Sequence, residues 1–533
     1  MRTVIIGGGS AGVAAAVHLR RKDENAEITI IEKSDEFAVA ACGLPYMLAG
    51  KIQSKDELIG ASTAEMHAIF NIDVRLQTEV LNINAEQKSL SLSGGEKLNY
   101  DKLIIAAGAL QLRPDIPGIL ADNIFTLHNL HSSQKIIDYF HGLNAKNVII
   151  LGGGIIGLRT AEALFDNGAR ITLIENGAHI LSDADYDFAQ LVQQKLKRPK
   201  FNIITNTSIK EFLPDRAVLG NGTKIKYDMA VIAAGSKSEN RLPIMTGIDL
   251  GETGGISVNT YMQTSKPDIF ACGDNAETTS LIDHAALRIN DASPALRSAK
   301  TAADNAAGIM TRMNGILENR IVKVFDYVIG KTGCNEDELK RADIPYHRLY
   351  LATGNGENYL PTSEKLYMKM LFGINGKILG LQIMGKTGVF SRLNTVAALI
   401  FKGATVQDMA DMPAAYFPEF SRAKDALNIL GTLAVDICFG SLKTADADKL
   451  SGSEILLNVC PPQRFRPAPD KPALNIPLSA LRENLSLLPR NKKIIVCGNG
   501  GYDAYLAYCI LTQRGFGRVF LLNSPDSWRE TEN

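Results

Sequence analysis

The chain has 533 residues, which is too long for a single hydrophobic core, so we expect about three or four domains. Its 57 lysine and arginine residues are balanced by 57 aspartate and glutamate residues, so no net field attracts it to nucleic acid or to a membrane surface. The hydrophobic content of 45% is that of an ordinary globular enzyme, and no apolar run is long enough to span a bilayer.

The cysteines and the amino terminus indicate a compartment. Seven cysteines, an odd number without a Cys-x-x-Cys pair, argue against both a disulfide framework and a zinc site. The sequence enters an apolar strand at residue 2, which leaves no room for a signal peptide. We therefore expect a protein of the reducing cytoplasm that holds no metal.

Residues 3–32 have the pattern of a strand, a glycine-rich turn, a helix and a second strand. An apolar strand is predicted at 3–6 and an alanine-rich helix at 11–20, with a G-x-G-x-x-G motif between them. Such glycines permit a tight turn against a pyrophosphate, which binds at the helix N-terminus. Glu32 ends the second strand, where it can accept hydrogen bonds from ribose hydroxyls. The predicted dinucleotide contacts are Gly7, Gly9, Ser10, Ala11, Gly12, Glu32 and Lys33.

The same pattern recurs at residues 147–175, with strands predicted at 147–151 and 170–174 and a helix at 158–167. Two complete fingerprints imply two dinucleotides. The second strand of this unit also ends in an acid, Glu175, which suits a free 2′-hydroxyl and would repel a 2′-phosphate. NADH is therefore favoured, while basic residues such as Arg159 and Lys195 keep NADPH as an alternative. The predicted contacts are Gly152, Gly154, Ile155, Ile156, Gly157 and Glu175.

Each fingerprint is followed by a strand that ends in Ala-Ala-Gly, at residues 100–108 and 227–235. We expect these to be the closing strand and crossover of each dinucleotide-binding segment. A later strand at 264–274 ends in Cys-Gly-Asp, which by itself is a common strand end. The Ala-Gly strands add three predicted cofactor contacts, Ala107, Gly108 and Gly235.

A single thiol lies in the run at 40–46, ten residues after Glu32. A thiol at this place would lie close to whatever the first fingerprint binds. The position five residues further on, where a second thiol would make a dithiol, is Met47. Cys42 must then find its redox partner in the substrate or cofactor. We interpret Cys42 as a redox-active thiolate that faces a flavin.

The two fingerprints, the Ala-Gly strands and the Gly-Asp segment together resemble the FAD-dependent pyridine nucleotide–disulfide oxidoreductases, from residue 1 to about 440. The resemblance implies that the first fingerprint binds FAD and that the second binds NAD(P)H. It also implies that Gly273 and Asp274 contact the flavin and that Asp274 bonds the ribityl chain of the flavin. It implies an α/β fold with two Rossmann-type domains and an α+β dimerisation domain. The implied bounds are 1–112 with 240–319 for FAD, 113–239 for NAD(P)H and 320–440 for dimerisation.

The dimerisation region alternates strands with helices. Strands at 367–372 and 378–384 flank a turn with two glycines, which predicts a hairpin. Helices are predicted at 394–401 and 406–409. Without the resemblance, nothing in these residues would indicate their function.

Within that superfamily the run at 42–46 resembles the coenzyme A-disulfide reductases. Two later segments, around Tyr359 and Tyr416, are similar to the tyrosine segments of that family. The resemblance implies a homodimer whose active sites are shared, because each tyrosine pair reaches Cys42 of the other subunit. Tyr359 alone could equally be a surface aromatic, whereas Tyr416 stands in a long matching run.

Other positions separate this chain from related groups. NADH oxidases and peroxidases fit less well, because their usual active-site histidine is Ser10 here, and Met47 excludes the two-cysteine reductases. The family's usual asparagine before the cysteine is Ala41, and its pattern near residues 293–300 is altered. These departures leave the thiol substrate open.

Two arginines, Arg20 and Arg21, end the first predicted helix. Cations at a helix C-terminus interact favourably with its dipole, and that would be a purely structural role. The resemblance instead suggests that they bind coenzyme A phosphates, which suits the geometry of a guanidinium group. Both interpretations stay open at this stage.

A polar link at 443–453 precedes a final segment that resembles a rhodanese domain, at 453–533. In that resemblance Gly498 takes the place of the catalytic cysteine, Cys497 comes one residue early, and Asp503 stands where arginine is common. We therefore expect a degenerate α/β domain that serves in docking or is vestigial. Strands are predicted at 454–459, 473–477, 493–497 and 518–522, with a helix at 503–514.

The predicted reaction passes two electrons from NADH through FAD to a disulfide at Cys42, which rests as a mixed disulfide with a small thiol such as coenzyme A. Tyr359 and Tyr416 are predicted to bond the leaving thiolate or give it a proton. Three functions remain open. They are a reductase of coenzyme A disulfide or related persulfides and polysulfides, an NADH oxidase acting through a cysteine sulfenic acid, and a non-catalytic flavin redox sensor.

Overall fold

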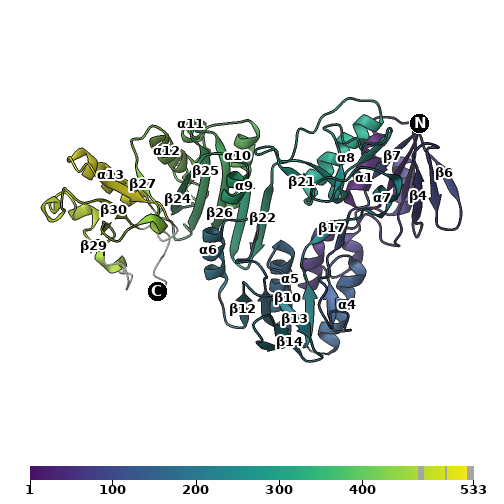
Figure 1. Cartoon of the computed structure of the whole chain (residues 1–533), viewed down its shortest axis with the longest axis horizontal. Coiled ribbons are helices and arrows are strands. Elements are labelled where there is room, and N and C mark those ends of the chain that lie inside the picture. The colour runs from purple at the N-terminus through teal and green to yellow at the C-terminus, as the bar shows by residue number, and fades with distance from the viewer. Residues whose placement is uncertain (144, 466–472, 499–500, 525–533) are drawn as a thin grey trace. The chain divides into compact units, whose positions relative to one another are not determined.

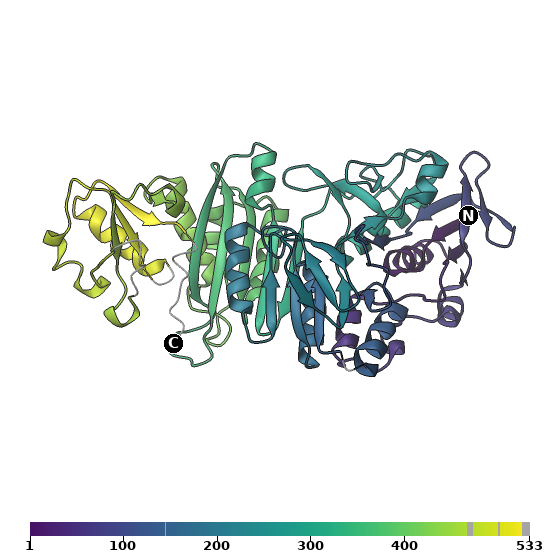
Figure 2. The ribbon, with the colours of Figure 1, turned by 60° about the horizontal axis from the view of Figure 1, so that its bottom comes forward.

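The computed structural model of the chain describes residues 1–143, 145–465, 473–498 and 501–524 (Figures 1 and 2). The chain divides into two compact units. One comprises Met1–Ser182 and Lys197–Ile316, and the other comprises Asp183–Leu196 and Leu317–Asn533. Among the described residues, no helix has both the length and the apolar character needed to cross a bilayer.

The first sheet of the first unit has five parallel strands in the order β19-β7-β1-β2-β3. Its strands are nearly continuous apolar runs, as expected for a parallel sheet that is covered on both faces. The predicted strand at 3–6 and helix at 11–20 are confirmed. The bounds are β1 (Arg2–Ile6), α1 (Ser10–Arg20), β2 (Glu27–Ile31), β3 (Ile72–Arg75), β7 (Lys102–Ile105), β19 (Ile269–Ala271) and α8 (Ala292–Ala306).

A second sheet repeats this architecture in the order β12-β11-β10-β16-β9 (Figure 1). The helix after its glycine turn begins at Ile155, three residues before the predicted helix at 158–167, because Gly154 is its N-cap. The bounds are β9 (Ile124–Thr126), α4 (Leu130–Gly142), β10 (Asn147–Leu151), α5 (Ile155–Asp166), β11 (Arg170–Ile174), β12 (Phe201–Ile204) and β16 (Met229–Ile232).

Small elements complete the first unit. An antiparallel ribbon, β8 (Ala109–Gln111) with β17 (Ser236–Ser238), joins the two strands that lead out of the sheets. Three sheets of three strands lie beside the main ones. Their strands are β4 (Val80–Asn84), β5 (Ser89–Leu92), β6 (Lys97–Asn99), β13 (Ile209–Phe212), β14 (Arg216–Leu219), β15 (Lys224–Lys226), β18 (Ile256–Ser257), β20 (Ala276–Thr279) and β21 (Ala286–Arg288). The short helices are η1 (Ala41–Gly43), α2 (Leu44–Leu48), η2 (Lys55–Leu58), α3 (Thr63–Phe70), α7 (Arg241–Thr246) and η3 (Gly273–Asn275).

The second unit is built on an antiparallel sheet in the order β22-β23-β26-β25-β24. Helix α10 packs on β23 and β26, and α12 packs on β24. The predicted hairpin is confirmed as β25 and β26. The bounds are β22 (Asn319–Val324), β23 (Tyr327–Gly333), α9 (Glu336–Arg341), β24 (Tyr346–Gly354), β25 (Lys365–Gly373), β26 (Ile378–Gly385), α10 (Val389–Phe401), α11 (Val406–Asp411) and α12 (Ala426–Cys438).

The terminal part of this unit is a parallel sheet in the order β27-β31-β30-β28-β29. The predicted strands and helix are confirmed, and with them the fold class. The polar segment at 443–453 is not simply a link, because β27 pairs with β31 and so belongs to the sheet. The bounds are β27 (Thr444–Ala445), η4 (Ala447–Lys449), β28 (Ile455–Asn458), η5 (Pro462–Arg464), β29 (Leu474–Asn475), η6 (Leu478–Ala480), η7 (Leu485–Leu487), β30 (Ile494–Cys497), α13 (Tyr502–Gln513) and β31 (Val519–Leu522).

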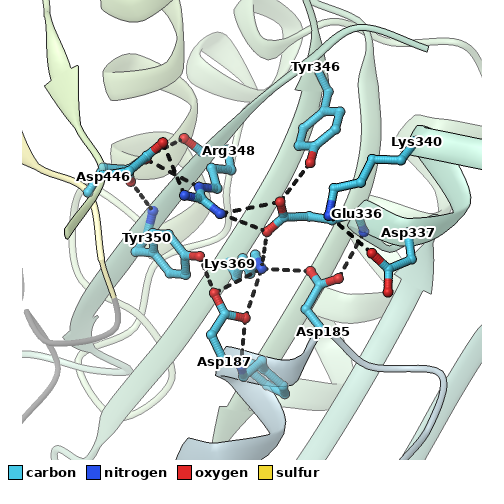
Figure 3. A network of polar contacts seen from close by, with 12 residues as sticks. Asp185, Asp187, Glu336, Asp337, Lys340, Tyr346, Arg348, Tyr350, Lys369 and Asp446 are labelled. Atoms are coloured by element: carbon cyan, nitrogen blue, oxygen red, sulfur yellow. Dashed lines mark hydrogen bonds and ion pairs between the residues drawn. The ribbon is translucent and has the colours of Figure 1, made fainter. Parts of the chain in front are cut away.

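One helix differs from the predicted domain bounds. Helix α6 (Tyr186–Leu196) lies inside the range 113–239 predicted for the NAD(P)H domain, but it belongs to the second unit. The segment is held there by a buried charge cluster around Lys369, whose side chain is fully buried (Figure 3). The Lys369 ammonium lies 2.8 Å from carboxylate oxygens of Asp185 and Asp187. It lies 2.5 Å from the Glu336 carboxylate.

The buried charges of this cluster compensate one another. Burial alone would raise the pKa of Glu336, but the Lys369 ammonium outweighs burial and holds that pKa at about 2. Arg348 extends the cluster, since its guanidinium lies 3.3 Å from Glu336 and 3.1 Å from Asp446 at the start of the terminal domain. A buried charge is tolerated when it is paired in this way, and losing one partner leaves the others uncompensated.

We expect Lys369→Met to lower the free energy of unfolding by about 3–5 kcal/mol, because it leaves buried carboxylates without their cation. Urea unfolding followed by circular dichroism measures the loss. Lys340→Met is the matched control, since the exposed Lys340–Asp337 pair should contribute less than about 1 kcal/mol. Equal effects of the two substitutions would contradict the assignment.

The Glu336 carboxyl predicts a pH dependence of stability. Its folded pKa of about 2 lies below the ordinary value of 4.5, so its contribution is complete above pH 4.5 and is lost as the pH falls toward 2. Glu336→Gln should remove this part of the acid destabilisation. Urea unfolding between these pH values would show parallel curves for both proteins if the assignment were wrong.

Candidate functional site

The first glycine turn has a backbone that only glycine can adopt. Gly7 has φ +109°, and a Cβ there would lie 2.2 Å from the Ala106 carbonyl oxygen. A Cβ on Gly12 would lie 1.9 Å from the Gly7 carbonyl oxygen, so α1 packs tightly on the turn. Gly9 is the N-cap of α1 and provides no side-chain cap, which leaves the first N–H groups of the helix for an anion.

Glu32 holds this turn in place. One carboxylate oxygen accepts the Gly8 N–H at 2.8 Å, and the other accepts the N–H and hydroxyl of Ser34 at 2.8 Å. Glu32 therefore braces the loop as well as standing at the strand end where ribose hydroxyls are predicted. An ionised carboxylate has about four acceptor positions, so one stays available for a ribose hydroxyl.

The second turn reproduces the first in detail. Gly152 has φ +115°, and a Cβ there would lie 2.2 Å from the Ala233 carbonyl oxygen. The Glu175 carboxylate accepts the N–H groups of Gly153 and Gly177, both at 2.7 Å. The chain thus has two equivalent dinucleotide cradles, each with a bracing acid.

The remaining predicted cofactor contacts surround these turns. Lys33 directly follows Glu32, and its ammonium lies 3.9 Å from the Glu239 carboxylate. Four of them occupy the first turns of α1 and α5, namely Ser10, Ala11, Ile155 and Ile156. Three lead from the sheets into the β8–β17 ribbon, namely Ala107, Gly108 and Gly235. Their contacts with a dinucleotide stay predictions.

The Gly-Asp turn lies against the start of α1. Gly273 has φ +73°, and a Cβ there would lie 2.7 Å from the Ala11 Cβ. Its N–H donates to the buried Ser298 hydroxyl at 3.0 Å. The half-buried Asp274 carboxylate makes no hydrogen bond or ion pair within the described ranges, and burial raises its pKa against the effects of Arg288 and His128. A carboxylate in this state fits a hydroxyl-bearing cofactor such as FAD.

Cys42 lies on a segment that is bonded to the first turn. Ala38, four residues earlier, donates its N–H to the Gly8 carbonyl at 2.9 Å. Cys42 itself is exposed, at the centre of η1. The next residue, Gly43, packs so closely that a Cβ would lie 2.1 Å from the Leu58 side chain. The thiol is therefore accessible and its backbone is fixed on both sides.

The helix that follows Cys42 also contacts the second dinucleotide-binding segment. The Arg159 guanidinium of α5 lies 4.8 Å from the centroid of the Tyr46 ring, and Asn167 donates to the Leu48 carbonyl at 3.1 Å. Arg159 also pairs with Glu162. The cation that the sequence offered as an NADPH contact is thus engaged with the Cys42 helix. Lys195, the other such cation, belongs to α6 of the second unit.

Sequence reasoning missed Glu36. Its carboxylate accepts the N–H groups of Leu130 at 3.1 Å and His131 at 2.9 Å, which open α4. A carboxylate at a helix N-terminus is stabilised by the helix dipole. Partners almost a hundred residues apart leave no local pattern that could have predicted this contact.

The two arginines of α1 have different roles. Arg20 is buried, and its five N–H donors all reach backbone carbonyls, those of Phe70, Asp23, Glu24, Ala26 and Asn71. The prediction that Arg20 binds substrate is therefore not retained, because the fold uses every donor. Arg21 is exposed, and its guanidinium lies 3.2 Å from His18.

The two predicted tyrosines lie together in the second unit. Tyr359 and Tyr416 are both exposed, by 69% and 51%. The neighbouring Tyr359 side chain, with the Glu357 carboxylate close by, raises the pKa of Tyr416. Residues far apart in sequence thus form one polar surface group. Glu357 was not predicted, since nothing in the sequence distinguishes it from other surface acids.

In the described part of the terminal domain's loop, the cysteine thiol is not accessible. Cys497 is buried, donates to the Leu457 carbonyl at 3.5 Å, and has its pKa raised to about 12 by burial. The Cys497 thiol is therefore directed to the neighbouring strand β28. Gly498 follows it, and the next two loop residues, Asn499 and Gly500, lie outside the described ranges.

Comparisons with known proteins give similar chains that are named as redox enzymes. Residues 1–306 match the family described as pyridine nucleotide-disulphide oxidoreductase, and residues 320–427 match its dimerisation domain. An NADH oxidase from Methanocaldococcus jannaschii is 30% identical, with 80% of this chain and 97% of that protein covered. An NAD(P)H coenzyme A polysulfide/persulfide reductase from Pyrococcus horikoshii is 29% identical, with the same 80% and 97% covered.

Two solved structures are similar over almost the whole chain. A reduced CoADR-RHD from Bacillus anthracis has a TM-score of 0.94 at 31% identity, with 98% of this chain and 96% of that chain covered. An NAD-dependent persulfide reductase from A. fulgidus also has a TM-score of 0.94 at 31% identity, with 99% and 100% covered. The likeness therefore includes the terminal domain.

We expect Arg20→Met to lower the free energy of unfolding by about 3 kcal/mol, because it leaves several carbonyls without a donor. Arg21→Met, at the adjacent exposed position, should change it by less than about 0.5 kcal/mol. Urea unfolding of both variants measures the difference. An Arg20→Met protein as stable as the parent would contradict the structural role of Arg20, and Arg20 would again be a candidate for binding substrate.

Proposed function

The chain belongs to the pyridine nucleotide-disulphide oxidoreductase family, and we propose that it uses NAD(P)H and FAD to reduce coenzyme A disulfide or related small disulfides, persulfides or polysulfides. The observation that carries the proposal is the exposed Cys42 on a segment bonded to the first dinucleotide turn. The position five residues later is Met47, so the protein offers no adjacent second thiol there. The similar CoADR-RHD and persulfide reductase support this substrate class.

The sulfur chemistry follows from a single cysteine. The Cys42 thiolate attacks a disulfide RSSR′. The attack forms a disulfide bond between the Cys42 sulfur and SR and releases R′S⁻. The released R′S⁻ then takes up a proton. Bound FAD supplies the route by which two electrons from NADH reach the mixed disulfide. Cleavage of that bond releases RSH and restores the Cys42 thiolate. The sum is NADH + H⁺ + RSSR′ → NAD⁺ + RSH + R′SH, and in the resting protein we propose that R is a small thiol such as coenzyme A.

Tyr359 and Tyr416 are proposed to serve the leaving thiolate of the partner subunit in a homodimer. Both hydroxyls are exposed, and the raised pKa of Tyr416 keeps that phenol protonated and able to donate. The match of residues 320–427 to a dimerisation domain supports the shared arrangement.

The exposed charges suggest how the substrates are distinguished. The Glu175 carboxylate at the second turn disfavours a 2′-phosphate, which supports NADH as the reductant. Arg21 is the exposed cation of α1 that remains for a coenzyme A phosphate, since Arg20 is used by the fold. Free thiol chemistry also requires a reducing compartment, so a cytoplasmic location stays our prediction.

A second candidate is an NADH oxidase, because one relative with 30% identity carries that name. In that case Cys42 would cycle through a sulfenic acid, with oxygen or peroxide as the acceptor. The two functions differ only in what reoxidises the reduced protein. Among the described loop residues of the terminal domain, Cys497 is buried and position 498 is glycine, so neither position offers an accessible thiol in either case.

We expect anaerobic NADH-reduced protein to be reoxidised rapidly by coenzyme A disulfide or a persulfide in stopped-flow mixing. Cys42→Ser should be reduced by NADH at the normal rate but lose reoxidation by these acceptors by at least about 1,000-fold, since no other exposed thiol replaces it. Cys438→Ser, which removes a partly buried thiol of the second unit, is the control and should behave as the parent.

Two results would contradict the reductase. Fast reoxidation by oxygen alone, to water, would favour the oxidase. Undiminished reoxidation of Cys42→Ser by the disulfide would exclude the single-cysteine chemistry.

A further inference from the structure

The two tyrosines lie on loops, and a loop alone does not hold a phenol in one place. Tyr359 lies between β24 and β25, and Tyr416 lies between α11 and α12. Both loops run past Arg392, which is on α10 and is only 4% exposed. A group that assists proton transfer must be held to within a fraction of an ångström, so the buried side chain behind the loops matters.

Arg392 bonds to both loops at once. Its Nη2 donates to the Asn355 carbonyl at 3.1 Å and to the Phe420 carbonyl at 3.4 Å, while Nη1 donates to the Gly388 carbonyl at 2.9 Å. Asn355 precedes Tyr359 by four residues, and Phe420 follows Tyr416 by four. The guanidinium therefore contacts the backbone of each tyrosine segment one short stretch from the phenol.

Asp425 fixes the guanidinium itself. Its carboxylate accepts Arg392 Nε at 3.2 Å and Nη2 at 2.6 Å, a two-point pairing, and it also accepts the Ser421 hydroxyl at 3.1 Å. Burial would raise the pKa of Asp425, but Arg392 overcomes it and lowers that pKa. The pair is thus ionised and rigid, and a planar guanidinium can serve several acceptors in fixed directions where a lysine cannot.

The loops are also bonded to each other. Glu357 donates its N–H to the Pro418 carbonyl at 3.1 Å, and its carboxylate accepts the Ala423 N–H at 3.0 Å. Gly356 is so close that a Cβ would lie 2.8 Å from the Pro418 carbonyl oxygen. With Arg392 behind them, the two loops form one assembly rather than two independent segments.

We propose that Arg392 is the positioning residue of the tyrosine pair, and that its guanidinium, oriented by Asp425, sets the spacing of the Tyr359 and Tyr416 hydroxyls. The inference rests on the function proposed above for these tyrosines. It assigns Arg392 no contact with substrate or cofactor. Its effect is confined to the step in which the leaving thiolate is released, so reduction by NADH does not depend on it.

The test uses the FAD-loaded protein and Arg392→Lys, which keeps the charge but loses the planar fork. Reoxidation of the NADH-reduced protein by coenzyme A disulfide should slow by about 10- to 100-fold, with the rate of reduction by NADH unchanged. In a Tyr359→Phe/Tyr416→Phe background the same substitution should slow reoxidation by less than about 2-fold, because its effect acts through the phenols. Hydrogen exchange should accelerate in both segments 355–361 and 416–423.

Lys331→Met is the matched control, because Lys331 is another buried cation of this sheet, 3.2 Å from Glu318 and Glu338. It should lower stability without slowing reoxidation. If Arg392→Lys does not fold, Asp425→Asn, which frees the guanidinium without removing it, should give the same pattern.

The outcomes separate the two proposals. Unchanged exchange in both segments, an equal slowing by Lys331→Met, or a full effect of Arg392→Lys without the phenols would each overturn the positioning role. A double phenylalanine variant that reoxidises as fast as the parent would instead overturn the proposed role of the tyrosines, whatever the exchange data show.

Discussion

The site depends on Gly8, whose backbone N–H and carbonyl each make a hydrogen bond to a different segment. Its N–H donates to the Glu32 carboxylate, and its carbonyl accepts from Ala38. A Cβ on Gly8 would lie 2.8 Å from the Phe37 ring, so the position requires glycine. Cys42 follows Ala38 by four residues and can lie no more than about 14 Å from it. The cofactor turn, its bracing acid and the thiol are therefore one hydrogen-bonded piece.

The second fingerprint is connected to the same piece. It repeats the same acid-braced turn, and its helix α5 contacts the helix after Cys42 through Arg159 and Tyr46. The thiol segment is thus hydrogen-bonded to the first dinucleotide turn and contacts the helix that follows the second. The sequence predicts the two turns separately, but only the fold shows that α5 contacts the helix after Cys42.

Short sequence patterns were sufficient to predict the elements that depend on neighbouring residues alone. Strands such as 147–151 and 170–174 are confirmed to the residue, because a buried parallel strand and a glycine turn have strong local signatures. Helix α6 lies within the range predicted for the NAD(P)H domain but groups with the second unit, since its place depends on Lys369, almost two hundred residues later. The polar segment at 443–453 hides strand β27, because a two-residue edge strand has no periodicity.

The candidate site was predictable to a similar extent. The thiol, the glycines and the bracing acids stand in recognisable motifs. Arg20 shows the limit, because its neighbour Arg21 lies beside it in sequence, and two of the carbonyls that accept from the buried Arg20 belong to the distant residues Phe70 and Asn71. Glu36, Glu357 and Arg392 were missed for the same reason, since each acts on a segment far away in the chain.

The central claim is that the Cys42 sulfur lies against the flavin. The most direct measurement is the visible spectrum of the FAD-loaded protein after mild reduction has freed its thiols. A thiolate in contact with an oxidised flavin produces a long-wavelength charge-transfer band, so we predict such a band in the parent protein and none in Cys42→Ser. A spectrum that is the same in both proteins would contradict this account.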